Sequence, residues 1–360
     1  MKRLKELDFL RGVAIILILL RHRHISNYTT NMGWIGVDLF FVLSGFLISK
    51  LIIVEYLNFK SFNPKRFLIR RGFKIYPLYF LCYLVYLIPI IYSRSFQPFQ
   101  FISDLFFIQN YTLGWGFAFG ASWSLAVEEH FYFSVAFFSY FGVKYLKQKN
   151  VLSFKLLRNL IISLLTFCLI LRFSSNLLFP FQNVRNSTMT HLRIDSLLAG
   201  VLISMFYHFR FEKLTIVFSK YKYLLLILFL IGISWTPFID PINSFFIKTI
   251  GFTLLYLSFS ILLFVFIMKE NIVVLLNKIL THHLVNFVSK IGSSSYAIYI
   301  IHTLINDTVL KIYFDFNFSY NRYIIFFITS GLSITFGIII TSTVEKYFLN
   351  LRDLYFPKKI

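Results

Sequence analysis

The feature that most constrains this chain is a succession of apolar runs, each about as long as the hydrocarbon core of a bilayer is thick. A run of about twenty apolar residues spans a bilayer as an α-helix. Hydrophobic residues make up 58% of the 360 residues and the mean hydropathy is +0.72, which is not expected of a soluble domain. The sequence therefore predicts an all-α, polytopic membrane protein, a helical bundle of about ten transmembrane helices. The candidate spans are residues 7–25, 33–57, 73–93, 121–143, 156–173, 191–209, 222–239, 245–268, 291–312 and 323–347.

Positive charge is unequally divided between the two sides of this predicted bundle. With the N-terminus in the cytoplasm, the inner segments hold 26 of the 36 Lys and Arg, the outer loops hold 9, and Arg11 lies inside the first span. Such an excess is typical of cytoplasmic loops, so we expect both termini in the cytoplasm. No loop is long enough to fold alone, which predicts a single membrane domain over residues 1–360 with no soluble domain. The net charge of +21 does not indicate nucleic-acid binding, because the cations lie between apolar runs.

Two shorter features limit the kinds of site that the chain can hold. Only two cysteines occur, Cys82 and Cys168, each within an apolar run. The sequence therefore indicates neither a disulfide framework nor a metal site. The apolar stretch from Phe99 to Asn110 is too short to cross a bilayer, so we expect it to be re-entrant or interfacial.

The first predicted span carries two polar residues, Arg11 and His22, in an otherwise apolar helix. They are eleven residues apart, about three helical turns, so they share a face and lie roughly 16 Å apart along the axis. An arginine inside a membrane helix should face a polar cavity or a partner. One interpretation is an ordinary span with cations at its ends, since Arg21 and Arg23 crowd the far end. The other is a polar stripe along a pore, with an anion-binding end and a proton-handling end.

Carboxylates occur near the predicted outer ends of two further spans. Asp38 begins the second span, where it could either interact favourably with the helix dipole or orient a histidine on the first helix. Glu128 and Glu129 lie about two turns inside the fourth span. Adjacent helical residues point about 100° apart, so one should face the pore while the other makes a structural contact, and spacing does not say which.

Cations cluster before the third span. Arg70, Arg71 and Lys74 belong to a basic segment that could reflect topology and anionic lipid, or could bind a phosphate-rich ligand. Arg193 and Asp195 near the start of the sixth span are either interfacial anchors or pore residues. His302, near mid-membrane in the ninth span, is either a hydrogen-bonded packing residue or another pore residue.

Taken in order, these pieces resemble the membrane acyltransferase-3 family, polytopic enzymes that O-acylate cell-surface carbohydrates. Any one piece is weak, but the ordered set is specific and covers nearly the whole chain. The matching pieces are Leu7 to Gly12 with His22, Ile35 to Ile48, Arg70-Arg71 ahead of Ile75-Tyr76-Pro77, Trp123 to Tyr132, Arg193 to Gly200 and Ser295 to His302.

The resemblance implies ten core helices, an acyl-coenzyme A donor and a glycan hydroxyl acceptor, with acetyl as the expected acyl group. It also implies that Arg11, His22 and the arginines before the third span are functional. The chain departs from the family at Lys74, which stands for the second arginine of an R-x-x-R motif, and at His130, which replaces a glutamine. The family often carries a soluble hydrolase domain or further helices after the core. This chain stops there, which puts in doubt a mechanism completed by a second domain.

We therefore expect an O-acyltransferase that uses acetyl-coenzyme A as a co-substrate, with no bound cofactor and with membrane lipids around it. The phosphates of the coenzyme A donor would bind Arg11, Arg70, Arg71 and Lys74. The acyl group of the donor would reach a cell-surface or lipid-linked glycan near His22. His22 would be the catalytic base, with Asp38, Glu128 or Glu129 stabilising its charged form; an acyl-histidine intermediate is the alternative route. The competing hypothesis is a transporter or flippase of a lipid-linked saccharide.

Overall fold

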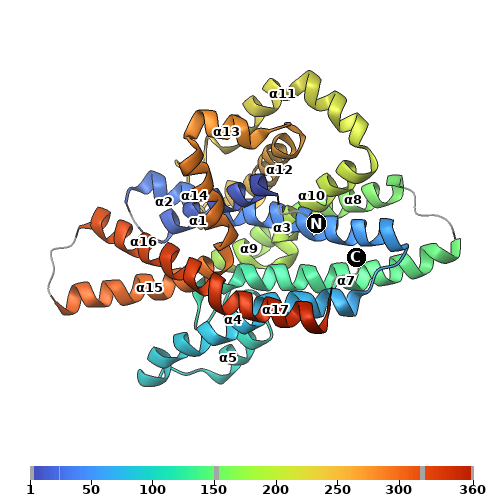
Figure 1. Cartoon of the computed structure of the whole chain (residues 1–360). Coiled ribbons are helices and arrows are strands. Elements are labelled where there is room, and N and C mark those ends of the chain that lie inside the picture. The colour runs from blue at the N-terminus through green and yellow to red at the C-terminus, as the bar shows by residue number, and fades with distance from the viewer. Residues whose placement is uncertain (1–3, 24, 150–153, 317–320, 358–360) are drawn as a thin grey trace.

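The computed structural model describes residues 4–23, 25–149, 154–316 and 321–357, without the side chains of 142–149, and every regular element in these ranges is helical (Figure 1). The first eight α-helices are α1 (Lys5–Arg21), α2 (Asn27–Gly33), α3 (Gly36–Phe59), α4 (Pro64–Tyr92), α5 (Pro98–Leu105), α6 (Gln109–Thr112), α7 (Trp123–Lys149) and α8 (Phe154–Leu178). The others are α9 (Asn183–Thr188), α10 (Thr190–Phe209), α11 (Phe211–Ile233), α12 (Phe252–Met268), α13 (Ile272–Leu280), α14 (His282–Ser293), α15 (Ser295–Asp315), α16 (Arg322–Ile340) and α17 (Lys346–Tyr355).

The predicted all-α membrane bundle is confirmed, and the number of spans is approximate. Each of the predicted spans falls on one of these helices. Seven helical segments of the described chain are long and apolar enough to cross a membrane by length and composition, or eight if one bent pair counts as a span. That pair is α13 and α14, and the chain bends by 118° between them. The sequence predicts an inner loop for this segment. The short apolar stretch around residue 100 forms the short helices α5 and α6, as expected of a segment that does not span.

Helix α1 is surrounded by other helices, and two glycines allow it to cross α14 closely. It packs against α3, α12, α14 and α15, and Ala14 and Ile15 are completely buried. A Cβ at Gly12 would lie 2.1 Å from the Val288 carbonyl oxygen, and one at Gly292 would lie 1.8 Å from that of Asp8. Only residues without a side chain allow the backbones of α1 and α14 to approach so closely.

A second close crossing joins α3 to α10. A Cβ at Gly45 would lie 1.9 Å from the Leu197 carbonyl oxygen, and one at Gly200 would lie 2.1 Å from that of Val42. In lipid, helix association depends on close packing and polar contacts, so small residues at the crossing fix the register of the two helices. This register brings Asp38 on α3 level with the first turns of α10.

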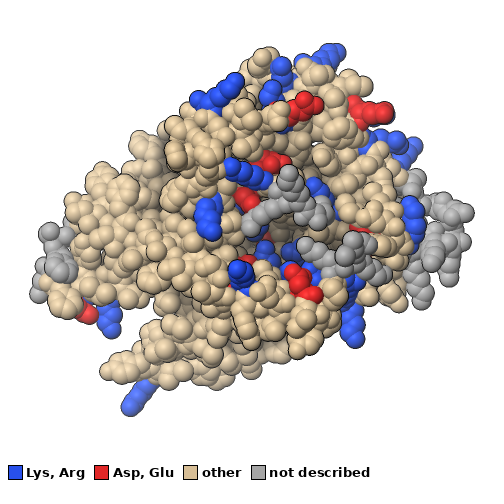
Figure 2. Space-filling model, viewed as in Figure 1, with Lys and Arg blue, Asp and Glu red and all other residues tan. Residues whose placement is uncertain are grey.

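The charged surface is uneven. In Figure 2 the visible Lys and Arg lie mainly at the top of the view, over α11 and α13, on the right and in the middle. The left part, formed by α15 and α16, is mostly tan. A tan, apolar flank is what a helix bundle presents to lipid.

Candidate active site

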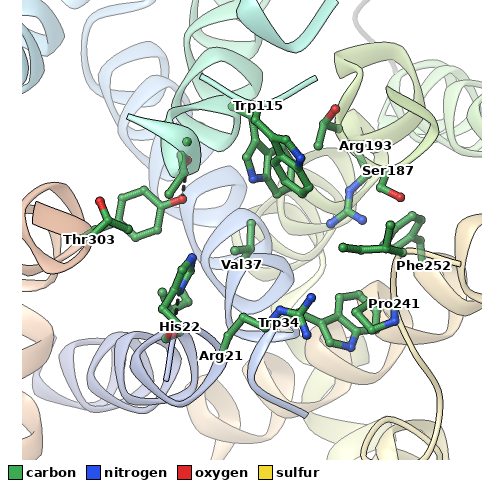
Figure 3. A pocket seen from close by; sticks show the side chains of 17 residues that line it. Arg21, His22, Trp34, Val37, Trp115, Ser187, Arg193, Pro241, Phe252 and Thr303 are labelled. Carbon is green, nitrogen blue, oxygen red and sulfur yellow. Dashed lines mark hydrogen bonds between the residues drawn. The ribbon is translucent and has the colours of Figure 1, made fainter. Parts of the chain in front are cut away.

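A cavity of about 390 Å³ lies at the C-terminal end of α1, between α3, α10, α12 and α15 (Figure 3). This volume falls within the range of ligand pockets, about 300–1,000 Å³. Three of the four tryptophans of the chain, Trp34, Trp115 and Trp123, line it. His22 and Arg193 also line it, so the cavity combines aromatic walls with a base and a cation.

His22 is the residue that ends α1, and its side chain is exposed to the cavity. Its Nδ1 lies 2.9 Å from the carbonyl oxygen of Ile18. A carbonyl oxygen only accepts hydrogen bonds, so in the neutral imidazole Nδ1 carries the hydrogen and Nε2 keeps its lone pair. The last turn of α1 thus fixes the tautomer that a general base needs.

His302 on α15 lies against His22. The two ring centroids are 4.5 Å apart, with the planes at 74°. Nδ1 of His302 lies 2.6 Å from the Tyr299 carbonyl oxygen, which again places the hydrogen on Nδ1. The ring is completely buried, and Nε2 has no hydrogen-bond partner in the described chain. No pattern in the sequence pairs these two histidines, which are 280 residues apart.

Two buried ion pairs hold the helices around the cavity. Nη2 of Arg193 lies 2.7 Å from Oδ1 of Asp38, to which Ser196 also donates a hydrogen bond at 3.1 Å. Arg172 on α8 lies 2.8 Å from Oδ2 of Asp195, and both side chains are completely buried. The predicted contact between Asp38 and a histidine of α1 is therefore not the one observed, because α10 supplies a nearer cation.

Arg193 is itself part of the cavity wall. Its guanidinium stacks on the ring of Phe252, 3.6 Å from the centroid, and lies 5.6 Å from that of Trp123. Figure 3 shows this group pointing into the cavity from the side opposite His22. The Phe41 ring lies 5.9 Å from it as well, and a guanidinium held by one carboxylate and three aromatic rings keeps a fixed direction while it retains donors for a polar ligand.

A separate polar group lies among α1, α3, α4 and α7, toward the inner side predicted from the charge distribution. Tyr132 donates a hydrogen bond of 2.8 Å to Glu128, and its oxygen lies 3.0 Å from that of Ser44. Arg11 and Arg71 are close enough to Glu128 to interact with its charge. Among the predicted donor ligands, Arg11 and Arg71 are thus brought together near Glu128, and Arg71 also interacts with the charge of Glu129.

The remaining predicted residues are placed around this group. Glu129 is buried and accepts a hydrogen bond of 2.8 Å from Tyr76, which gives it the structural contact expected of one of the two glutamates. Arg70 instead binds α17, through the carboxylate of Asp353 at 2.8 Å and the carbonyl of Phe356. Lys74 is half-buried one turn further along α4.

A buried carboxylate that the sequence did not single out organises the loop carrying Trp115. Asp104 on α5 accepts hydrogen bonds of 3.0 Å from the backbone N–H groups of Phe117 and Ala118, and one of 2.9 Å from Tyr83. This side chain is completely buried. The loop before α7 is therefore held in place, and Trp115 with it. The sequence signal that could have identified Asp104 is an aspartate inside a short apolar segment.

The sequence matches the model of a family described as an acyltransferase domain over residues 4–342. It is 31% identical over 170 residues to a peptidoglycan O-acetyltransferase, OatA, of Listeria monocytogenes, covering 42% of this chain and 26% of that protein. It is 30% identical over 177 residues to a putative peptidoglycan O-acetyltransferase of Bacillus subtilis, covering 45% and 27%. The matched region is thus about a quarter of each relative's length. No solved structure matches.

Proposed function

Since the chain belongs to this acyltransferase family, we propose that it is a membrane O-acyltransferase that moves an acyl group to a hydroxyl of a cell-surface or lipid-linked glycan. The relatives named as O-acetyltransferases of peptidoglycan support acetyl as the group and a glycan as the acceptor. We also propose that both termini face the cytoplasm, where acyl-coenzyme A is available.

The inner polar group is the proposed donor site. Arg11 and Arg71 lie near the carboxylates of Glu128 and Glu129, and Arg70 and Lys74 add two further cations on the same helix as Arg71. Guanidinium groups bind phosphate through two parallel hydrogen bonds. Lys74 lies one turn from Arg71. Lys74→Arg should be tolerated or beneficial, because a guanidinium offers the two parallel donors that an ammonium group lacks.

The cavity at His22 is the proposed acceptor site. Indole rings bind sugars by stacking on their C–H faces, and three tryptophans line this cavity. Arg193 offers hydrogen-bond donors to hydroxyl or carboxylate oxygens from the opposite wall. Because the donor is long and anionic only at one end, its thioester can reach His22 while its phosphates stay with Arg11.

In the proposed reaction His22 is the general base. Its Nε2 takes the proton of the acceptor hydroxyl as the oxygen attacks the thioester carbonyl, and the carbon–sulfur bond then breaks. The same proton passes from Nε2 to the departing thiolate, which restores the neutral histidine. In the alternative route Nε2 attacks the thioester first and carries the acyl group. Mixing the protein with labelled donor and no acceptor distinguishes the two, since only the second route labels the protein.

The observation that supports this proposal most directly is the tautomer of His22, whose Nδ1 is held by the Ile18 carbonyl oxygen while the side chain lines an aromatic cavity. General-base catalysis contributes about 10²–10⁴-fold, so His22→Ala should lose at least about a hundredfold in glycan acylation while still binding donor. His24→Ala, outside the described residues, is the matched control and should stay active. Near-normal acylation by His22→Ala would refute the proposal.

The competing transporter hypothesis predicts a different result in the same assay. A transporter of a lipid-linked saccharide would not consume acetyl-coenzyme A when offered glycan. No observation on the described helices favours it over acyl transfer, and membership of an acyltransferase family supports the enzyme.

A further inference from the structure

Helix α17 follows the region matched by the family, which ends at residue 342, yet it docks beside the proposed donor site. It packs against α4, as Figure 1 shows for the two labelled helices. Arg70 binds the Asp353 carboxylate and the Phe356 carbonyl, and the rings of Phe73 and Phe356 lie 5.9 Å apart. Two polar contacts and one aromatic contact thus hold the end of α17 on the first turns of α4.

This docking brings another arginine to the basic group. Arg352 binds both oxygens of Asp353, at 3.0 Å from Nε and 3.0 Å from Nη2, and only 16% of its side chain is exposed. It is close enough to Arg70 and Arg71 for their charges to repel. A helix that positions like charges together in this way has an electrostatic cost, which a bound anion would remove.

The charges of this region do not balance. Five guanidinium groups interact electrostatically along a chain of neighbours, and the carboxylates recorded among them in the described residues are three, Asp353, Glu128 and Glu129. The excess of positive charge suits a ligand with several negative charges rather than one. The guanidinium groups are those of Arg11, Arg66, Arg70, Arg71 and Arg352.

We propose that Arg352 binds the 3′-phosphate of the coenzyme A donor, and that Arg70 positions Arg352 by anchoring α17. This inference rests on the proposed function. In coenzyme A the 3′-phosphate is far from the thioester, while the diphosphate lies between them. The cations near Glu128 lie inside the bundle, among α1, α4 and α7, and would meet the diphosphate. Arg352 lies on α17, at the edge of this group of arginines. The end of the donor that carries the 3′-phosphate would remain there.

The test measures equilibrium binding of coenzyme A and of dephospho-coenzyme A, which lacks the 3′-phosphate, to the purified full chain in detergent. Arg352→Ala should weaken coenzyme A binding about tenfold, since a charge-assisted hydrogen bond is lost. Its binding of dephospho-coenzyme A should match that of the unchanged protein. Lys346→Ala is the matched control, because Lys346 is an exposed cation on the same helix, and it should bind both ligands normally.

A second variant separates phosphate binding from the anchoring of α17. Asp353→Asn keeps an oxygen that accepts from Arg70 and Arg352 but removes the charge that neutralises them, so coenzyme A binding should be unchanged or tighter. The proposal is overturned if Arg352→Ala binds coenzyme A normally, if it weakens both ligands equally, or if Asp353→Asn weakens binding as Arg352→Ala does. If the unchanged protein binds neither ligand, the proposed function fails instead.

Discussion

Removing the Asp38 carboxylate should destabilise the protein, because it leaves Arg193 as a buried charge without its counter-ion. Arg193 is 2% exposed and Asp38 is completely buried, so the pair is shielded from bulk solvent. Breaking a buried ion pair from one side costs about 3–5 kcal/mol. Ser196 also loses an acceptor, worth about 1 kcal/mol. Asp38→Leu should therefore lower the free energy of unfolding by about 4–6 kcal/mol.

Equilibrium unfolding in mixtures of a mild detergent and dodecyl sulfate measures this free energy. Asp38→Leu combined with Arg193→Met should recover most of the loss, since replacing both partners of a buried pair with apolar residues is often neutral. Asp315→Leu, at an exposed aspartate near the end of α15, is the control and should change little. The reasoning is refuted if Asp38→Leu is as stable as the unchanged protein, or if the double variant is no more stable than the single one.

Three further results are expected. Gly200→Leu should cost at least about 3 kcal/mol of unfolding free energy, because its side chain would meet the backbone of α3, whereas Gly331→Leu, which has open space around it, should be tolerated; equal effects would contradict the crossing described. Arg71→Ala should weaken donor binding by about one to two powers of ten, measured with labelled acetyl-coenzyme A, and an unchanged affinity would remove this residue from the site. Topology reporters at Lys149 and at Asn317, the latter outside the described residues, should report inside and outside respectively, and the same side for both would contradict the predicted orientation.

The fold could largely be predicted from hydrophobicity, since each predicted span coincides with a helix. The exception is α13 and α14, which have 9 and 12 residues. Each is shorter than a bilayer, and their lysines and paired histidines, His282 and His283, make the segment read as a loop. What makes them part of the bundle is the crossing of Gly292 with α1, and no local pattern reveals which helix a glycine will meet.

The site was predictable in its parts and not in its pairings. The spacing of Arg11 and His22 predicts that they lie on one face of α1 at different depths. In the structure Arg11 lies at the inner polar group and His22 at the cavity. For Asp38 the sequence leaves two roles open, an interaction with the helix dipole or the orientation of a histidine, because it shows the depth of this residue in the membrane but not the helix it faces. Arg172 could have been noticed by the same reasoning as Arg11, since it is an arginine inside an apolar run that must find a partner.

The separation of the Arg11 and Arg71 group from the His22 cavity has an electrical consequence for the proposed reaction. The phosphates, which carry the donor's charge, stay on one side, and only an uncharged thioester arm extends toward the other. An acyl group leaves outward, while the proton of the acceptor hydroxyl returns inward as the thiol hydrogen of free coenzyme A. The acyl group and the hydrogen exchange places between two uncharged molecular ends, so no net charge crosses the membrane. Turnover should therefore proceed equally well at any membrane potential, although each elementary charge moved through the full membrane potential would otherwise involve about 2.3 kcal/mol per 100 mV.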